Sequence, residues 1–257
     1  MTAQAEAADL HRRNTECRHR SVDVRRGMNE AEAQDVLAQF SHELRNFLGI
    51  IRSAMHILKA GAVENVAHEE ARLLIDRQVI QMTRMVDDLL DVSRLRKGGL
   101  QLHCARIDIC MVVARAMRAV EYVMQQREHR MTVSYPAQAL WLRGDEARLE
   151  QVFVNLLLNS AKYTDVGGDI GLSIKREGDE AVIEVRDTGI GIAANVLPRI
   201  FDLYVQGNPS SRDGGLGLGL PLVRALVESH GGRITAASEG IGRGSEFCVR
   251  LPAFTQP

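Results

Sequence analysis

The feature that most constrains this chain is a heptad repeat of apolar residues between positions 37 and 58. Apolar side chains recur at alternating steps of three and four residues, at Leu37, Phe40, Leu44, Phe47, Ile51, Ala54 and Leu58. This is the spacing of a helix that buries one stripe against partner helices. The seam predicts a long helix from Met28 to Lys59 that packs lengthwise on other helices.

A second amphipathic segment follows a predicted connection at 60–67. Its seam, with steps of four and three, is formed by Ile75, Val79, Met82, Val86, Leu89 and Ser93. No proline interrupts residues 28–97, and Gly98-Gly99 is typical of a helix end. Two such helices form an antiparallel hairpin that cannot bury its whole apolar stripe alone. We therefore expect a homodimer through a four-helix bundle, with a hairpin packed on its own chain as the alternative.

His42 occupies heptad position f of the first helix, the position furthest from the seam. Its side chain is expected to face water, within reach of a second domain or molecule. Taken alone, an exposed histidine on such a helix is an ordinary surface residue. Its meaning depends on what the rest of the chain can do.

The composition limits the classes of function. The 257 residues carry 45% hydrophobic and 25% charged residues, as expected for a packed globular protein of one or two domains. A net charge of −1 does not favour nucleic acid as a partner. No apolar run approaches the roughly 20 residues of a membrane span. The four cysteines lack metal or disulfide spacing, so we expect a cytoplasmic protein. Residues 1–27 are expected to form a polar tail or a helical lead-in.

From residue 100 the pattern changes to mixed α and β. Strands are expected at 100–109, 130–143, 169–176, 180–187, 233–238 and 245–251, and helices at 110–127, 145–161 and 218–229. Asp145 is a plausible N-cap, and Gly178-Asp179 a hairpin turn. The order predicts an α/β sandwich with a mixed or antiparallel sheet over residues 100–257.

Two asparagines and a lysine share one face of the helix expected at 145–161 and its continuation. Asn155 and Asn159 are four residues apart, and Lys162 follows three later. Amides on an otherwise apolar helix are costly to bury without partners. An amide oxygen is also a suitable ligand for Mg²⁺. The spacing therefore indicates either a phosphate and Mg²⁺ site or a polar helix edge.

Two glycine-rich segments complete the candidate site. Asp187-Thr188-Gly189-Ile190-Gly191 follows a strand, so its carboxylate could accept a hydrogen bond from an amine such as that of adenine. Gly215-Leu216-Gly217-Leu218-Gly219-Leu220 leads into a helix, as in a phosphate cradle. It lacks the Lys-Ser/Thr ending of a P-loop and follows a loop rather than a Rossmann strand.

These three segments resemble the N, G1 and G2 boxes of the Bergerat-type ATPase fold. With Phe40-Ser41-His42-Glu43-Leu44-Arg45-Asn46 upstream, the chain resembles a sensor histidine kinase core. Residues 199–202 resemble its F box, and 229–233 with 244–247 resemble its C-terminal strands. The resemblance implies a dimerising helical hairpin at 28–98, then a Bergerat-type α/β sandwich with a mixed sheet at 100–257. It assigns Mg²⁺ to Asn159 and ATP to Asn155, Asn159, Lys162, Tyr163, Asp187, Gly189, Gly191, Gly215, Gly217, Gly219 and Leu220.

One position separates kinases from hydrolytic relatives, which carry a water-activating glutamate four residues before the metal-binding asparagine. Here that position is Asn155. The resemblance then implies that His42 attacks the γ-phosphate, that Glu43 accepts the other imidazole proton, and that phosphate passes to an aspartate of a separate response-regulator receiver domain. It also implies regulator phosphatase activity through Asn46.

Phe47 departs from the resemblance, because the family usually has proline there. Unlike proline, Phe47 has a backbone N–H that can donate a hydrogen bond within the helix. We therefore expect a straighter first helix. Residues 192–214 are expected to form a lid over the nucleotide. Other functions fit parts of the pattern: a non-catalytic dimeric nucleotide-binding scaffold, an ATP-independent histidine phosphotransferase, or a serine kinase acting on an anti-anti-sigma partner. Input would come from an upstream sensor or input protein.

Overall fold

The computed structural model describes residues 30–59, 65–96, 101–205 and 217–254. The chain divides into two compact units, one within Val24–Lys97 and the other within Gly98–Pro257. The predicted tail at 1–27, the predicted helix end at Gly98-Gly99 and residues 206–214 of the predicted lid lie outside the described residues.

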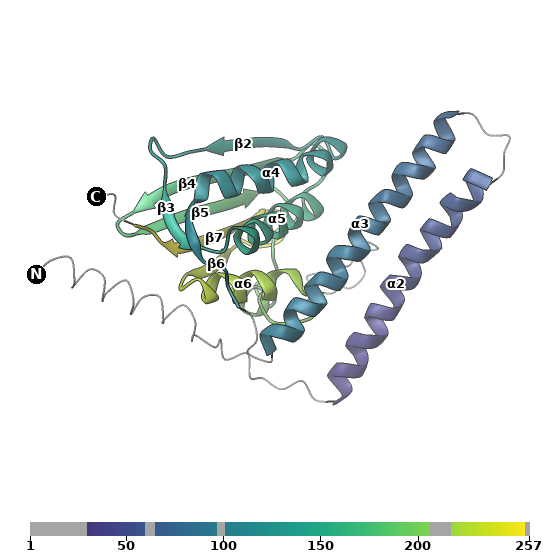
Figure 1. The fold of residues 1–257 in the computed structure, drawn as a ribbon, viewed down its shortest axis with the longest axis horizontal. Coiled ribbons are helices and arrows are strands. Elements are labelled where there is room, and N and C mark those ends of the chain that lie inside the picture. The colour runs from purple at the N-terminus through teal and green to yellow at the C-terminus, as the bar shows by residue number, and fades with distance from the viewer. Residues whose placement is uncertain (1–29, 60–64, 97–100, 206–216, 255–257) are drawn as a thin grey trace, which may run out of the picture. The chain divides into compact units, whose positions relative to one another are not determined.

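The first unit is a pair of long helices, α2 (Glu30–Lys59) and α3 (Asn65–Arg96), which pack against each other (Figure 1). Helix α2 continues without interruption through Phe47, as expected where no proline removes a donor. Helix α3 begins inside the predicted connection of 60–67. Asn65 suits a helix N-terminus and Val66-Ala67 contain no helix breaker, so the helix starts earlier than the seam indicated.

The face of α3 that is buried within one chain differs from the predicted seam by one residue. Ala71, Gln78 and Val92 are buried, whereas Val79 is 49% exposed and Val86 39% exposed. The hairpin alone thus leaves large apolar side chains exposed on both helices: Leu48, Ile50, Met55, Ile57, Leu73, Val79, Ile80, Val86 and Leu90.

The second unit is built on a five-stranded sheet with the order β2-β4-β5-β7-β6. The strands are β2 (Arg130–Ser134), β4 (Asp169–Glu177), β5 (Glu180–Asp187), β7 (Ser245–Pro252) and β6 (Arg233–Ala237). Only β2 and β4 pair in parallel; the other three pairs are antiparallel. The sheet is therefore mixed, and helices α4 (Ile109–Gln126), α5 (Glu146–Tyr163) and α6 (Gly219–Ser229) lie over one face (Figure 1).

The segments around α4 are more broken than predicted. The expected strand at 130–143 is two strands, β2 and β3 (Trp141–Gly144), which belong to different sheets. Pro136 lies between them and cannot donate a ladder hydrogen bond. The expected strand at 100–109 is only β1 (Ala105–Asp108), which pairs antiparallel with β3. It ends because Asp108 caps α4 by accepting a 3.0 Å hydrogen bond from the Cys110 amide.

The two faces of the sheet have opposite character because side chains alternate along each strand. Along β4, Ile170, Leu172 and Ile174 are buried on the helix-covered face. Fully buried Phe153 on α5 and Phe247 on β7 add to this core. Each such side chain contributes about 1.5–3 kcal/mol when removed from water.

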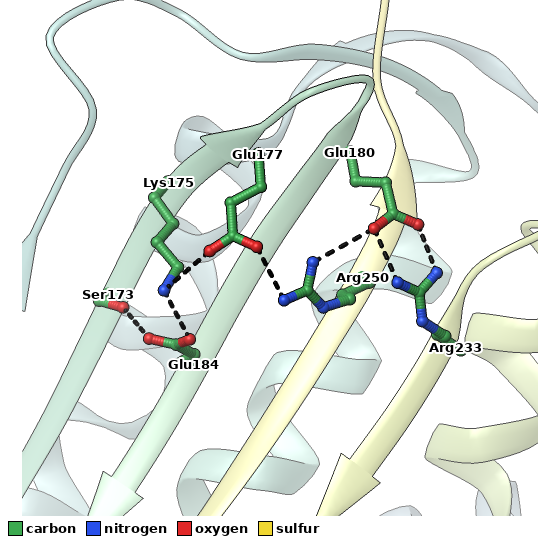
Figure 2. Close-up of polar contacts among 7 residues, drawn as sticks. All are labelled: Ser173, Lys175, Glu177, Glu180, Glu184, Arg233 and Arg250. Carbon is green, nitrogen blue, oxygen red and sulfur yellow. Dashed lines mark hydrogen bonds and ion pairs between the residues drawn. The ribbon is translucent and has the colours of Figure 1, made fainter.

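On the opposite face, acidic and basic side chains from four strands form a network of ion pairs (Figure 2). Arg250 bonds Glu177 at 2.8 Å and Glu180 at 3.3 Å, and Arg233 also pairs with Glu180. Lys175 extends this network through an ion pair with Glu184 at 2.8 Å. The hydrogen bond from Arg233 is the main reason that the pKa of Glu180 is lowered. Such half-exposed pairs contribute little individually, so the network marks the solvated face of the sheet.

Candidate nucleotide-binding site

Helix α5 positions the asparagine-rich segment. Asp145 is its N-cap, with Oδ1 accepting a 3.2 Å hydrogen bond from the Arg148 amide. The buried stripe of α5 packs into the core and leaves Asn155, Asn159 and Lys162 half-buried beside it. These three side chains share a helical face, as their spacing predicts.

The amide nitrogen of Asn155 is buried and has no hydrogen-bond partner among the described residues. An unpaired buried donor costs about 1–3 kcal/mol, so the site favours an acceptor such as a phosphate oxygen. The first residue of α6 lies at the same place, since a Cβ on Gly219 would stand 4.0 Å from this nitrogen. Two of the predicted boxes therefore meet at Asn155.

The C-terminal end of α5 is held by residues that the sequence did not single out. Arg127 donates to the carbonyl oxygens of Ala161 and, at 2.9 Å, Lys162. His129 Nε2 lies 3.0 Å from the same Ala161 oxygen. These carbonyls have no partner within the helix, and a guanidinium beside them also complements the helix dipole. Beyond them, the Lys162 ammonium lies 5.1 Å from the centre of the Tyr163 ring.

Asp187, the last residue of β5, is 4% exposed and held by four donors. Its Oδ1 accepts from the amides of Gly189 at 2.9 Å and Ser245 at 3.1 Å. Its Oδ2 accepts from the hydroxyl of Ser245 at 2.6 Å and from that of Ser160 at 3.4 Å. The carboxylate is thus oriented before any ligand arrives. Neither serine was predicted to act here, because β7, which carries Ser245, and α5, which carries Ser160, meet the end of β5 only in the folded domain.

The glycines allow close backbone contacts. A Cβ on Gly189 would overlap the Tyr163 carbonyl, which accepts a 2.9 Å hydrogen bond from the Ile190 amide. Gly191 has a φ of +69°, and a Cβ there would overlap the Gly240 carbonyl. The G1 segment is therefore wedged between the end of α5 and the loop after β6.

The G2 segment is described from Gly217 onward. Gly217 has a φ of +65° and its carbonyl accepts a 3.0 Å hydrogen bond from the amide of Tyr204. Gly219 and half-buried Leu220 open α6. Gly215 lies outside the described residues. The structure thus brings Asn155 to Gly219, and Tyr163 to Gly189 and Ile190.

The phosphoacceptor candidates lie on the other unit. His42 and Glu43 are within α2, but their side chains are outside the described part of the structure. Asn46 is exposed on the same helix. Among the described residues, no group of three or more His, Cys, Asp or Glu side chains could hold a metal ion. An Asn159 amide oxygen together with substrate phosphates is a donor set that suits Mg²⁺.

Two family models match the chain without overlapping. The first, the His Kinase A (phospho-acceptor) domain, matches residues 32–98. The second, the histidine kinase-, DNA gyrase B- and HSP90-like ATPase, matches residues 144–255. The chain belongs to the histidine kinases. Its fold, a helical segment followed by a Bergerat-type α/β domain with a mixed sheet, is confirmed.

Curated histidine kinases and sensor proteins resemble the chain over most of its length. Sensor protein KdpD of Escherichia coli is 34% identical over 86% of this chain, and the signal transduction histidine-protein kinase BaeS of the same organism is 31% identical over 87%. The chain spans 24% of the length of KdpD and 48% of BaeS. None of the helices in the described residues is long and apolar enough to cross a membrane.

Solved histidine kinases share the fold. Acinetobacter baumannii AdeS has a TM-score of 0.60 at 22% identity, covering 83% of this chain and 98% of that one. The kinase ThkA, solved in complex with the response regulator protein TrrA, has a TM-score of 0.63 at 19% identity, covering 86% of this chain and 61% of that one. At these identities the likeness concerns the fold alone.

Proposed function

We propose that this histidine kinase core binds Mg²⁺–ATP at α5, the G1 segment and α6, and transfers the γ-phosphoryl group to His42. The main support for this proposal is the buried side-chain amide nitrogen of Asn155, which has no hydrogen-bond partner among the described residues and lies four residues before Asn159. An amide nitrogen is a donor and cannot accept a proton from water, so this position supplies no base for hydrolysis. ATP bound there would keep its γ-phosphate until a nucleophile arrives.

The chemistry assigned to the chain is an in-line displacement. A neutral His42 ring nitrogen forms a bond to the γ-phosphorus while the bond to the bridging β-phosphate oxygen breaks, releasing ADP. Glu43, the next residue, accepts the proton from the other ring nitrogen. Lys162 offsets charge on the phosphate oxygens. Mg²⁺, held through Asn159 and the phosphates, would supply further charge neutralisation when bound.

The adenine end of the nucleotide is assigned to Asp187. Its Oδ2 can accept a hydrogen bond from the exocyclic amine, and its four protein donors hold the carboxylate in place. Gly189 and Gly191 allow the backbone after Asp187 to pack against the Tyr163 and Gly240 carbonyl groups, which fixes its path beside the carboxylate. Tyr163 is assigned to the wall of the adenine pocket, and Gly215, Gly217, Gly219 and Leu220 to the phosphate-binding segment at the start of α6.

The partners follow from the same assignment. Phosphate on His42 would pass to an aspartate of a receiver domain, and ThkA, which shares the fold, was solved with a response regulator. Asn46, exposed one helical turn after His42, would orient water for dephosphorylation of that regulator. The large apolar side chains exposed on α2 and α3 support a homodimer in which two hairpins form a four-helix bundle.

The test is to incubate the chain with γ-labelled ATP and Mg²⁺. We expect an acid-labile, base-stable label that is lost in His42→Gln and kept in His56→Gln, a matched change at an exposed histidine of the same helix. ATP affinity, measured by calorimetry, should be unchanged in both variants. Label retained in His42→Gln, or no ATP binding by the unaltered chain, would contradict the proposed function.

A further inference from the structure

Helices α5 and α6 run antiparallel, and both ends of α6 contact α5. At one end, a Cβ on Gly219 would stand 4.0 Å from the Asn155 amide nitrogen. At the other, the Asp145 amide donates a 2.9 Å hydrogen bond to Nε2 of His230. The two contacts are separated by ten residues along α5 and eleven along α6. They therefore mark the two ends of the contact between α6 and the first half of α5, about 15 Å apart along the helix axis.

The imidazole of His230 is fixed in one tautomer. Nδ1 lies 2.7 Å from the carbonyl oxygen of Leu226, which can only accept, so Nδ1 carries the proton. Nε2 is then an acceptor and receives the Asp145 amide proton. The ring is 7% exposed, and burial lowers the pKa of His230, which favours this neutral form. One side chain thus links the last turn of α6 to the residue that caps α5.

The other partner in this bond is also held firmly. The Asp145 carboxylate caps α5 through the Arg148 amide and accepts a 2.8 Å hydrogen bond from the His103 amide. Next to it, Gly144 leaves room for the imidazole, since a Cβ there would stand 3.1 Å from His230 Cδ2. The position of the Asp145 amide is therefore fixed, so its hydrogen bond to His230 can determine the position of α6.

We propose that His230 is a positioning residue that sets the register of α6 along α5, and so places the Gly217–Gly219 backbone opposite Asn155. The proposal rests on the ATP site assigned above. The buried apolar side chains of α6, such as Leu222 and Leu226, hold the helix on the core but are not directional. The hydrogen bond is directional. A slip of one residue moves α6 by about 1.5 Å, and displacements of about 1 Å suffice to impair a reactive site.

If His230 has this role, its loss should affect the phosphate contacts and the adenine contacts of the nucleotide differently. The adenine end is built from Asp187 and Ser245 on β5 and β7, whereas the phosphate end uses the start of α6. A loss of register should therefore weaken the phosphate contacts and leave adenine contacts in place. The measurable quantity is the ratio of ATP affinity to adenosine affinity.

Two substitutions distinguish the hydrogen bond made by Nε2 of His230 from the one made by Nδ1. In His230→Gln, the amide oxygen can stand where Nε2 was and accept from the Asp145 amide. In His230→Asn, the shorter amide can donate to the Leu226 carbonyl in place of Nδ1 but does not reach Asp145. Both variants are uncharged and polar, so they differ chiefly in the bond between α5 and α6. Fluorescence of Trp141, the single tryptophan, checks that this unit is folded.

Calorimetry with Mg²⁺–ATP and with adenosine on the full chain tests the proposal. In His230→Asn we expect the preference for ATP over adenosine to fall by about tenfold, the equivalent of one hydrogen bond to a neutral partner. Adenosine affinity should stay unchanged, and His230→Gln should keep most of the preference. An unchanged ratio in His230→Asn, or equal losses for both ligands in both variants, would overturn the positioning role while leaving the proposed function intact. An unaltered chain that binds no ATP would overturn both.

Discussion

The hydroxyl of Ser245 donates a 2.6 Å hydrogen bond to Oδ2 of Asp187, the carboxylate assigned to adenine. The register of β5 and β7 places these two residues directly opposite each other, 58 positions apart in the sequence. The Ser245 amide holds the second carboxylate oxygen. Ser245 therefore fixes the plane of the carboxylate from a neighbouring strand.

Ser245→Ala should weaken ATP binding by roughly tenfold, because hydrogen bonds to charged groups contribute about 1.5–3 kcal/mol and part of this loss is recovered by water. Isothermal calorimetry measures the change. Ser173→Ala is the matched control, since its hydroxyl also donates to a carboxylate, that of Glu184 at 2.9 Å, but on the solvated face of the sheet. Equal affinities in both variants would show that Ser245 does not support the adenine site.

Gly191→Ala should abolish measurable ATP binding and lower the stability of the second unit by more than about 1–3 kcal/mol, the cost of a residue in a strained backbone conformation. The added Cβ would also overlap the Gly240 carbonyl. Gly178→Ala is the control: its φ is +60°, yet nothing lies within 4 Å of the added Cβ. We expect that variant to lose stability through strain alone and to bind ATP normally, with Trp141 fluorescence reporting unfolding in urea.

Local signals in the sequence predicted the local structure well. The Asp145 cap and the hairpin around Gly178-Asp179 are present as expected, because both depend on residues within a few positions of each other. The mixed sheet and the helices on one of its faces also agree with the predicted sandwich. The strand expected at 130–143 was wrong in one respect, since a proline inside it separates two strands of different sheets.

Contacts between distant segments could not be predicted. The support of Asp187 by Ser245, and of the end of α5 by Arg127, depends on strand order and loop paths that no pattern in the sequence encodes. The buried face of α3 illustrates another limit. Gln78 is buried and its neighbour Val79 is half exposed, the reverse of what a rule based on hydrophobicity predicts.

The exposed position of Val79 and Val86 leads to a prediction about assembly. Val79→Lys combined with Val86→Lys should convert the proposed dimer to monomers, because two charges would be buried without partners in the bundle. Sedimentation velocity distinguishes the two masses. Glu70→Lys places a lysine at an exposed, already charged position on another side of α3 and should leave the dimer intact. A double variant that still sediments as a dimer would exclude this face as the interface.

The hydrogen bond between Asp145 and His230 also predicts how stability depends on pH. Burial lowers the pKa of His230 below its ordinary value of about 6.5, so the unfolded chain binds a proton that the folded chain does not. Protonation would turn Nε2 from an acceptor into a donor facing the Asp145 amide, and within the described residues the charged group that acts on the ring is the Asp145 carboxylate. The stabilisation is therefore complete above about pH 6.5 and is lost as the pH falls from there towards the lowered pKa.

We accordingly expect the free energy of unfolding of the second unit, followed by Trp141 fluorescence in urea, to fall between pH 7.5 and pH 5.5. His230→Gln cannot take up a proton but keeps an acceptor for the Asp145 amide, so its stability should fall less over the same interval. The difference between the two slopes isolates His230 from the other titrating groups, which both proteins share. Parallel slopes would mean that His230 takes up its proton equally in the folded and unfolded chain, and that the neutral imidazole is not required for the contact between α5 and α6.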